Sequence, residues 1–404
     1  MRIALLLLLL AAPAAAAQEA ARPLPRPAEA APDMAAWIAA FRPRALAQGI
    51  DAATFDRAMA GVRTLPDTIR LDRSQNEFTK TIGDYLALAV SEARVRDGQA
   101  ALRRHATTFD AIERRWGVDR HVVAAIWGLE SSYGLWRGDV PTLSALATLA
   151  ADARRPDFFE PQLVEALRIL QGGETTEAAM RGSWAGAMGH TQFMPTSFRD
   201  HAVDFDGDGR RDLWGDDPAD ALASAAAYLK ANGWTEGQPW GVEVILPEGF
   251  DYLLTGGRVE KPAAAWTALG VRTATGGPLP DAGPASIRVP AGHRGAAFAT
   301  FGNFRVLETY NTADAYVIGV GHLADRLRGG PPLRRPWPEG ERALTHAERI
   351  ELQERLRAAG FDPLAIDARI GPDTLDAMQR WQASLGLVPD GYAGPEALAL
   401  LRRR

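Results

Sequence analysis

The residue whose surroundings point most directly to chemistry is Glu130. It ends a mostly apolar segment, residues 121–130, whose pattern predicts a helix with Asp119 as N-cap and an end before Gly134. Apolar surroundings disfavour the charged form of a carboxyl group, and a helix C-terminus adds negative partial charge, so both raise its pKa. A carboxylic acid tuned in this way can protonate a glycosidic oxygen near neutral pH. The alternative is a glutamate that only caps the surface end of a helix.

A second segment, residues 182–195, has the sequence Gly-Ser-Trp-Ala-Gly-Ala-Met-Gly-His-Thr-Gln-Phe-Met-Pro. Its small residues let the backbone approach a ligand closely, while Ser183 and Gln192 offer neutral hydrogen-bonding groups. Such a lining suits an amide-bearing sugar.

Residues 204–212 form an acidic loop with oxygen ligands at positions 1, 3, 5 and 9 and a glycine at position 6, as in an EF-hand. Asp204, Asp206 and Asp208 occupy the first three of these positions. Position 12 is Gly215 instead of glutamate, so the closing carboxylate must come from elsewhere, and Asp220 is the expected source. The loop therefore predicts a structural calcium ion, with a metal-free Asp-Gly turn as the alternative.

The sequence contains no motif for a catalytic metal ion or for a serine nucleophile. The seven histidines lack the close spacing of a zinc site, and neither a glycine-rich phosphate loop nor a serine nucleophile elbow is present. We therefore expect no cofactor for catalysis.

These residues must be positioned by a mostly helical body. The hydrophobic pattern is helical from residue 34 to about 231, in segments that include 34–48, 78–96, 99–116 and 161–171. Between residues 241 and 304 it changes to short β-like runs, 242–246, 287–289 and 296–301, separated by glycine and proline. Helix returns at residues 312–327. The pattern predicts a helical domain, residues 33–328, with a small inserted β-containing subdomain.

A second, smaller domain is expected after a linker rich in proline and glycine, residues 329–344. Within residues 345–402, a motif that begins at Asp367 is echoed 23 residues later at Asp390. Each copy contains Gly-Pro, which predicts a helix start because the fixed φ of proline suits the first turn.

The beginning of the chain has the features of an export signal. Residues 1–17 contain an Ala/Leu run followed by small residues suited to cleavage after Ala17, and residues 18–32 are typical of a flexible leader. A membrane anchor would need about 20 apolar residues, more than this run provides. We expect a soluble, exported, periplasmic protein without a membrane span.

Composition excludes several other classes. The chain of 404 residues is 47% apolar and 24% charged, which is ordinary for a soluble globular protein with two or three domains. It contains no cysteine, which excludes a lipid-modified cysteine, disulfides, thiolate metal sites and cysteine nucleophiles. The net charge of -5 argues against nucleic acid as a partner.

Four motifs, in this order along the chain, resemble those of a known family. They are Glu130-Ser-Ser-Tyr-Gly134, residues 182–195, Ala202-Val-Asp-Phe-Asp-Gly-Asp-Gly209 and Tyr310-Asn311. Together they resemble the lytic murein transglycosylases of the membrane-bound transglycosylase B type, over roughly residues 33–328.

The resemblance implies a lysozyme-like helical fold and cleavage of the bond between N-acetylmuramic acid and N-acetylglucosamine without water. It assigns the role of sole catalytic acid and base to Glu130. This residue would protonate the leaving oxygen and then accept the proton of the C6 hydroxyl of muramic acid, whose attack closes an anhydro ring.

Further site residues follow from the resemblance by position. Ser183, Gln192 and Asn311 would bind the sugar beside the scissile bond. Aromatic side chains would line the cleft, and an arginine pair would meet the lactyl or peptide carboxylates of the substrate; these residues are Tyr85, Tyr310, Tyr316, Arg154 and Arg155. Core packing is the alternative for the tyrosines, and a solvated helix end is the alternative for the arginines. In the acidic loop, the resemblance adds the backbone carbonyl of Arg210 as a calcium ligand.

Residues 345–402 resemble the three-helix peptidoglycan-binding domain found beside many wall hydrolases. The expected partners are therefore peptidoglycan strands, together with other cell wall enzymes. Two rival functions stay open. One is a hydrolase in which water attacks with help from a second carboxylate such as Asp139, Asp152 or Asp200. The other is a wall-binding protein without activity.

Overall fold

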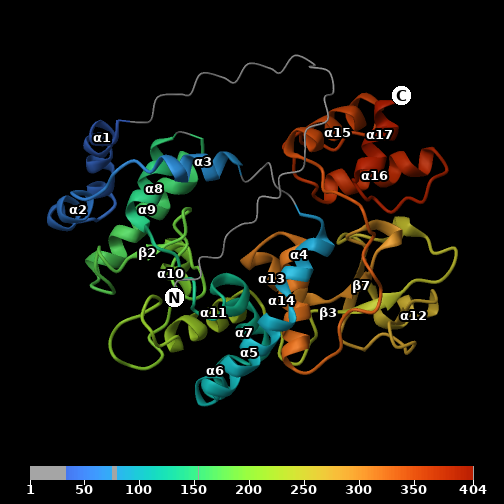
Figure 1. Cartoon of the computed structure of the whole chain (residues 1–404), viewed down its shortest axis with the longest axis horizontal. Coiled ribbons are helices and arrows are strands. Elements are labelled where there is room, and N and C mark those ends of the chain that lie inside the picture. The colour runs from blue at the N-terminus through green and yellow to red at the C-terminus, as the bar shows by residue number, and fades with distance from the viewer. Residues whose placement is uncertain (1–32, 75–79, 153, 404) are drawn as a thin grey trace, which may run out of the picture. The chain divides into compact units, whose positions relative to one another are not determined.

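The computed structural model describes residues 33–74, 80–152 and 154–403, and Figure 1 shows the chain from blue to red. The expected signal peptide and leader lie outside the described residues. Helices dominate before residue 240, and their bounds are α1 Met34–Ala47, α2 Ala52–Met59, α3 Pro66–Ser74, α4 Ile82–Ala89, α5 Glu92–Arg104, α6 Ala106–Trp116, α7 Arg120–Ser131, α8 Thr142–Ala151, α9 Pro156–Gln171, α10 Pro195–His201 and α11 Ala219–Ala231. A two-stranded pair joins β1 Val140–Pro141 to β2 Arg181–Gly182.

Helix α7 lies at the centre of the first hydrophobic core. Every residue from Val122 to Gly128 is buried, and the helix packs against α5, α6, α11 and α14 (Asp314–Leu327). Because all its faces are covered, α7 has the fixed position that a catalytic side chain requires.

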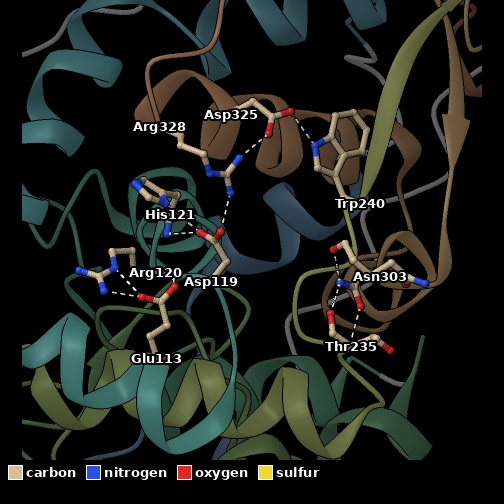
Figure 2. Close-up of polar contacts among 10 residues, drawn as sticks. Glu113, Asp119, Arg120, His121, Thr235, Trp240, Asn303, Asp325 and Arg328 are labelled. Atoms are coloured by element: carbon tan, nitrogen blue, oxygen red, sulfur yellow. Dashed lines mark hydrogen bonds and ion pairs between the residues drawn. The ribbon is translucent and has the colours of Figure 1, made fainter. Parts of the chain in front are cut away.

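The N-terminal end of α7 is held by a chain of polar contacts (Figure 2). As predicted, Asp119 is the N-cap, accepting a hydrogen bond from the backbone N–H of His121 at 2.7 Å. It also accepts one from Arg328 Nη2 at 2.6 Å, and Arg328 Nη1 bonds Asp325 at 2.9 Å. Asp325 in turn accepts the indole N–H of Trp240 at 2.9 Å. The start of α7 is thereby joined to the end of α14 and to Trp240, which directly precedes the first strand of the β subdomain.

A second core joins α8, α9 and α10 to the two N-terminal helices α1 and α2. Phe41, Phe55, Phe159 and Phe198 are its largest buried side chains. This core carries the segment 182–195 beside the end of α7, since Met188 and Phe193 are buried within it.

The predicted β subdomain is inserted between α11 and α13 (Gly302–Tyr310). Its antiparallel sheet has the order β4-β6-β7-β3-β5 and packs on Trp266 of α12 (Ala263–Ala268), whose indole N–H donates to Ala285 O. The strands are β3 Gly241–Ile245, β4 Lys261–Pro262, β5 Arg272–Thr273, β6 Pro284–Arg288 and β7 Ala297–Thr300. Two 3₁₀ turns, Tyr252–Leu254 and Gly292–Arg294, complete it.

The C-terminal domain consists of α15 His346–Ala358, α16 Pro372–Ser384 and α17 Pro395–Arg402 around Trp381. The two Gly-Pro motifs begin α16 and α17, as predicted. In each copy of the repeat, a buried glutamine amide holds the turn that begins with an aspartate: Gln353 with Asp367, and Gln382 with Asp390. The sequence echo therefore corresponds to two equivalent turns.

The predicted mainly helical class with a small β subdomain and a three-helix C-terminal domain is confirmed. Several predicted helix boundaries were wrong, and α9 begins at Pro156 instead of residue 161. The segments 78–96 and 99–116 were expected as two helices, but their described residues form α4, α5 and α6. Ser91 accepts a hydrogen bond from the Arg94 backbone and starts α5 as an N-cap, and His105 separates α5 from α6. No helix in the described part of the chain is long and apolar enough to cross a bilayer.

Candidate active site

Glu130 lies in the last turn of α7, and two sets of contacts fix this end of the helix. The chain leaves through Ser132 and Tyr133, both with positive φ, so it turns sharply after Ser131. Ser131 Oγ donates a hydrogen bond of 2.6 Å to the backbone oxygen of His190. The Tyr133 hydroxyl donates to Arg94 O at 2.9 Å. The end of α7 that carries Glu130 is thus held between segment 182–195 and α5.

The carboxyl group of Glu130 accepts a hydrogen bond of 2.5 Å on Oε1 from the hydroxyl of Tyr316 on α14. Burial raises the pKa of Glu130 to about 7, although the Tyr316 hydrogen bond opposes the rise. At neutral pH the group is therefore present in both protonation states. Because Tyr316 occupies Oε1, Oε2 is the atom that can carry a proton toward a ligand.

Tyr85 and Tyr310 belong to the same environment. Burial, and then the nearby charge of Glu130, raises the pKa of Tyr85 to about 12, and the same two causes raise that of Tyr310 well above its usual value. A Cβ atom on Gly319 of α14 would come within 3.1 Å of the Tyr85 ring, so this ring packs closely on α14. The Tyr310 hydroxyl donates to Thr191 O at 2.6 Å. The structure therefore brings the three predicted tyrosines together around Glu130.

The segment 182–195 is folded tightly against itself. A Cβ on Gly182 would lie 2.0 Å from Ala187 O, and one on Gly189 would lie 2.1 Å from Leu213 O, so neither position has room for a side chain. Ser183 Oγ accepts from the backbone N–H of Ala187 at 3.1 Å and keeps its own proton available for donation.

Gln192 offers a ligand a hydrogen-bond acceptor. Its backbone has a φ of 52°, and its Nε2 donates to Gly189 O at 2.8 Å and to Arg137 O at 3.1 Å. Both amide hydrogens are thereby engaged, so Oε1 is the atom available to a ligand. An oriented carbonyl oxygen is an electron-rich neighbour for developing positive charge.

Asn311 follows α13 directly and is exposed. Its Oδ1 accepts from the backbone N–H of Ala313 at 3.0 Å, which leaves the amide N–H₂ as its donor group. The residue sits in the short turn between α13 and α14, one position after Tyr310 and five before Tyr316.

His190 is a buried residue of this region whose role sequence reasoning missed. Its Nδ1 accepts the indole N–H of Trp127 at 3.1 Å, and its Nε2 lies 2.8 Å from Gly215 O, so Nε2 carries the proton. Burial lowers its pKa, which keeps the ring neutral. Its place among small residues was the only signal in the sequence.

Arg288 was also missed, since it lies within the β-like run 287–289, which gave no sign of a role. Its Nη1 bonds both oxygens of Asp314 at 3.0 Å, and its Nη2 bonds Glu308 at 3.0 Å. The guanidinium also stacks on Phe304, 4.3 Å from the ring centre. Glu308 lies on α13 and Asp314 on α14, so one side chain of the β subdomain ties together the helices that carry Tyr310 and Tyr316.

The arginine pair predicted to meet substrate carboxylates has an internal partner. Arg154 Nε and Arg155 Nη2 each lie 2.5 Å from the carboxylate of Asp72 on α3, which is buried. One carboxylate balances one of the two guanidinium charges, so the pair keeps a net positive charge. A role in binding the substrate stays a prediction.

The acidic loop has the geometry of a cation site. One carboxylate oxygen from each of Asp204, Asp206 and Asp208 lies within 4.8 Å of the others. Asp220 is buried, and it accepts backbone N–H groups from residues 205, 206 and 212 at 2.7, 3.3 and 2.8 Å. In this structure Asp220 thus braces the loop. Three close carboxylates repel one another, and their hard oxygen atoms suit calcium.

The sequence matches two known families. The Transglycosylase SLT domain covers residues 33–325, and the Putative peptidoglycan binding domain covers residues 345–401. Among curated proteins, "Membrane-bound lytic murein transglycosylase B" of Escherichia coli (strain K12) is 40% identical over 150 residues, which are 35% of this chain and 41% of that protein. The match thus spans less than half the length of this relative.

Solved structures agree with these matches. SltB3 from Pseudomonas aeruginosa, solved in complex with NAG-NAM-pentapeptide, is 50% identical and has a TM-score of 0.89 over 91% of this chain and 99% of that chain. Escherichia coli Slt35, solved in complex with bulgecin A, is 27% identical with a TM-score of 0.63 over 74% and 93% of the two chains. The same transglycosylase in complex with calcium is 26% identical with the same TM-score and coverage.

Proposed function

The chain belongs to the Transglycosylase SLT domain family, and on that premise we propose that it is a peptidoglycan lytic transglycosylase. It cleaves the β-1,4 bond between N-acetylmuramic acid and N-acetylglucosamine and forms 1,6-anhydro-N-acetylmuramic acid ends. The observation that carries the proposal is the carboxyl group of Glu130, whose pKa is raised to about 7 and which Tyr316 holds in place.

Glu130 acts first as an acid and then as a base. Its proton passes from Oε2 to the glycosidic oxygen as the bond to the muramic acid C1 breaks. The carboxylate then takes the proton of the C6 hydroxyl of the same sugar, and the hydroxyl oxygen closes the anhydro ring at C1. The substrate supplies its own nucleophile, so neither water nor a second carboxylate is consumed.

The polar neighbours assist by position and charge. Gln192 presents Oε1 and Asn311 presents its amide N–H₂ to the sugar, while the Ser183 hydroxyl offers a further donor. As positive charge develops on the sugar ring, the interaction with an oriented carbonyl oxygen strengthens, which lowers the barrier.

The structure supports this route over the hydrolase. Burial and the Tyr316 hydrogen bond are the causes of the shifted pKa of Glu130, and no acidic neighbour among the described residues contributes to it. Of the carboxylates proposed for water activation, Asp200 is exposed and held by Arg199 through both oxygens at 2.7 and 2.8 Å, and Asp139 is exposed. Mass spectrometry of products from purified sacculi tests the proposal. Anhydro ends are expected, and reducing ends would establish the hydrolase.

The acidic loop holds a structural calcium ion in our proposal, and catalysis needs no cofactor. Asp204, Asp206 and Asp208 supply carboxylate oxygens, and the Arg210 backbone carbonyl and Asp220 are the remaining predicted ligands. The calcium complex of the Escherichia coli relative supports this assignment. The ion would hold the loop that follows segment 182–195 and has no part in proton transfer.

The C-terminal domain tethers the enzyme to its polymeric substrate and so raises the local concentration of glycan. Peptidoglycan is thus the partner of both domains. Export to the periplasm in soluble form, and association with other cell wall enzymes, stay predictions from the sequence.

A further inference from the structure

A cavity of about 590 Å³ opens between the C-terminal domain and the β subdomain. Its walls come from the turn Gly292–Arg294, from the linker at Glu341 and Arg342, and from the turn and first residues of α17 around Tyr392 and Glu396. The volume falls within the range of small-ligand sites. None of its lining residues belongs to the candidate active site.

The turn that forms one wall is fixed on both sides. Within the C-terminal domain, Asp390 Oδ1 accepts from Gln382 Nε2 at 2.9 Å. Its Oδ2 accepts from the backbone N–H of His293 at 2.9 Å and lies 2.6 Å from the His293 Nδ1 of the β subdomain. The equivalent Asp367 of the first repeat has contacts within its own domain only, among those described. Of the two equivalent aspartates, Asp390 is thus the one that contacts the β subdomain, and its turn forms part of the cavity wall.

The most exposed apolar side chains of the lining are aliphatic. Leu387 and Val388 are 41% and 40% exposed, whereas Trp381 is 2% exposed. Tyr392 also lines the cavity but is only partly exposed. Exposed aliphatic side chains beside charged groups suit a short peptide with methyl side chains.

The charged part of the lining can exchange partners with a ligand. Arg294 pairs with Glu341 and lies 3.3 Å from Glu396, whose side chain is 78% exposed. An exposed ion pair of this kind is worth little, so a ligand carboxylate can replace Glu396 at Arg294. The released glutamate can then bind a ligand amine. The site therefore fits a peptide that carries both free carboxylates and an amine.

We propose that this cavity binds the pentapeptide borne by N-acetylmuramic acid, with its methyl groups on Leu387 and Val388 and a carboxylate on Arg294. The inference rests on the proposed function, since it takes peptidoglycan as the ligand. It adds that the C-terminal domain recognises peptide more than sugar, and that the β subdomain contributes to this recognition. Strands that keep their peptides would be held more firmly than bare strands.

The test compares two immobilised glycan strands, one with its pentapeptides and one stripped of them by an amidase. The full-length Glu130→Gln chain, which cannot cut, is the parent. Val388→Asp and Leu387→Asp place a negative charge in the wall facing the ligand carboxylates. Leu364→Asp is the matched control, because Leu364 is 68% exposed on the same domain and outside the cavity. Melting temperatures verify that each variant is folded.

We expect both cavity variants to raise Kd about tenfold on peptide-bearing strands and to leave Kd unchanged on stripped strands. The control should bind both strands as the parent does. Unchanged binding to peptide-bearing strands, or an equal loss on both strands, would overturn the peptide site. Release of anhydro products by Val388→Asp with an intact Glu130 tests the proposed function separately, since that release on short glycans should stay normal.

Discussion

The hydroxyl of Tyr316 donates a hydrogen bond of 2.5 Å to Oε1 of Glu130, across 186 residues of sequence. The contact joins two buried helices, α7 and α14, and fixes the carboxyl orientation. It also opposes the burial that raises the pKa of Glu130 to about 7. One hydroxyl group therefore sets both the direction and the acidity of the proposed acid.

The pH dependence of activity should follow this contact. Glu130 must be protonated for the first step, so kcat/KM should fall as pH rises through about 7. Tyr316→Phe removes a donor to the charged form, which raises the pKa further and should move the alkaline limb up by about one pH unit while the rate falls. Tyr133→Phe, which loses a hydroxyl bound to Arg94 O, is the control. The release of anhydro products, measured as a function of pH, checks this prediction. An alkaline limb that stays in place in Tyr316→Phe would contradict the role of Tyr316.

We expect Arg288 to influence the alkaline limb of the pH profile as well, because it bonds Asp314 of α14, the helix that carries Tyr316. Arg288→Met removes the ion pairs that link Glu308 to Asp314. The Tyr316 hydroxyl should then no longer be held within hydrogen-bond distance of Glu130. We expect roughly a tenfold lower kcat and an alkaline shift like that of Tyr316→Phe, with no further shift in the double variant. Arg288→Lys, which keeps the cation, should recover part of the rate. A lower melting temperature with a normal pH profile would reduce Arg288 to a packing role.

Asn311 should act on turnover and hardly on stability, because its side chain is exposed. Loss of one polar contact to a transition state typically costs on the order of a hundredfold in rate, so Asn311→Ala should lower kcat by about that factor. The exposed Asn232, which bonds Tyr228 O at 2.8 Å from the end of α11, provides the matched alanine control. Normal turnover in Asn311→Ala would remove the residue from the site.

Calcium should raise the melting temperature of chelator-treated protein, because an ion bound only by the native state stabilises it. Asp204→Ala should abolish the rise, whereas Asp281→Ala, at an exposed aspartate outside the loop, should keep it. A calcium titration followed by thermal melting makes the measurement. A flat titration of the parent protein would establish the metal-free turn.

The sequence predicted the local parts of the fold and the site. Asp119 as N-cap, the apolar helix that ends near Glu130 and the Gly-Pro helix starts all depend on neighbouring residues, and the structure confirms them. The Transglycosylase SLT domain match confirms the predicted family. What stayed hidden depends on residues far apart in the chain. The Arg288 tie and the pairing of Arg154 and Arg155 with Asp72 have no periodicity or spacing to reveal them.

We propose that Glu130 transfers protons in a cleavage that uses no water, and an isotope experiment distinguishes this route from hydrolysis. Purified sacculi are digested in ¹⁸O-labelled water by the parent enzyme and by Glu130→Gln, and the released fragments are analysed by mass spectrometry. We expect anhydro ends without ¹⁸O from the parent and nearly no release from Glu130→Gln, which should keep its melting temperature. Reducing ends that carry ¹⁸O, or full release by Glu130→Gln, would contradict it.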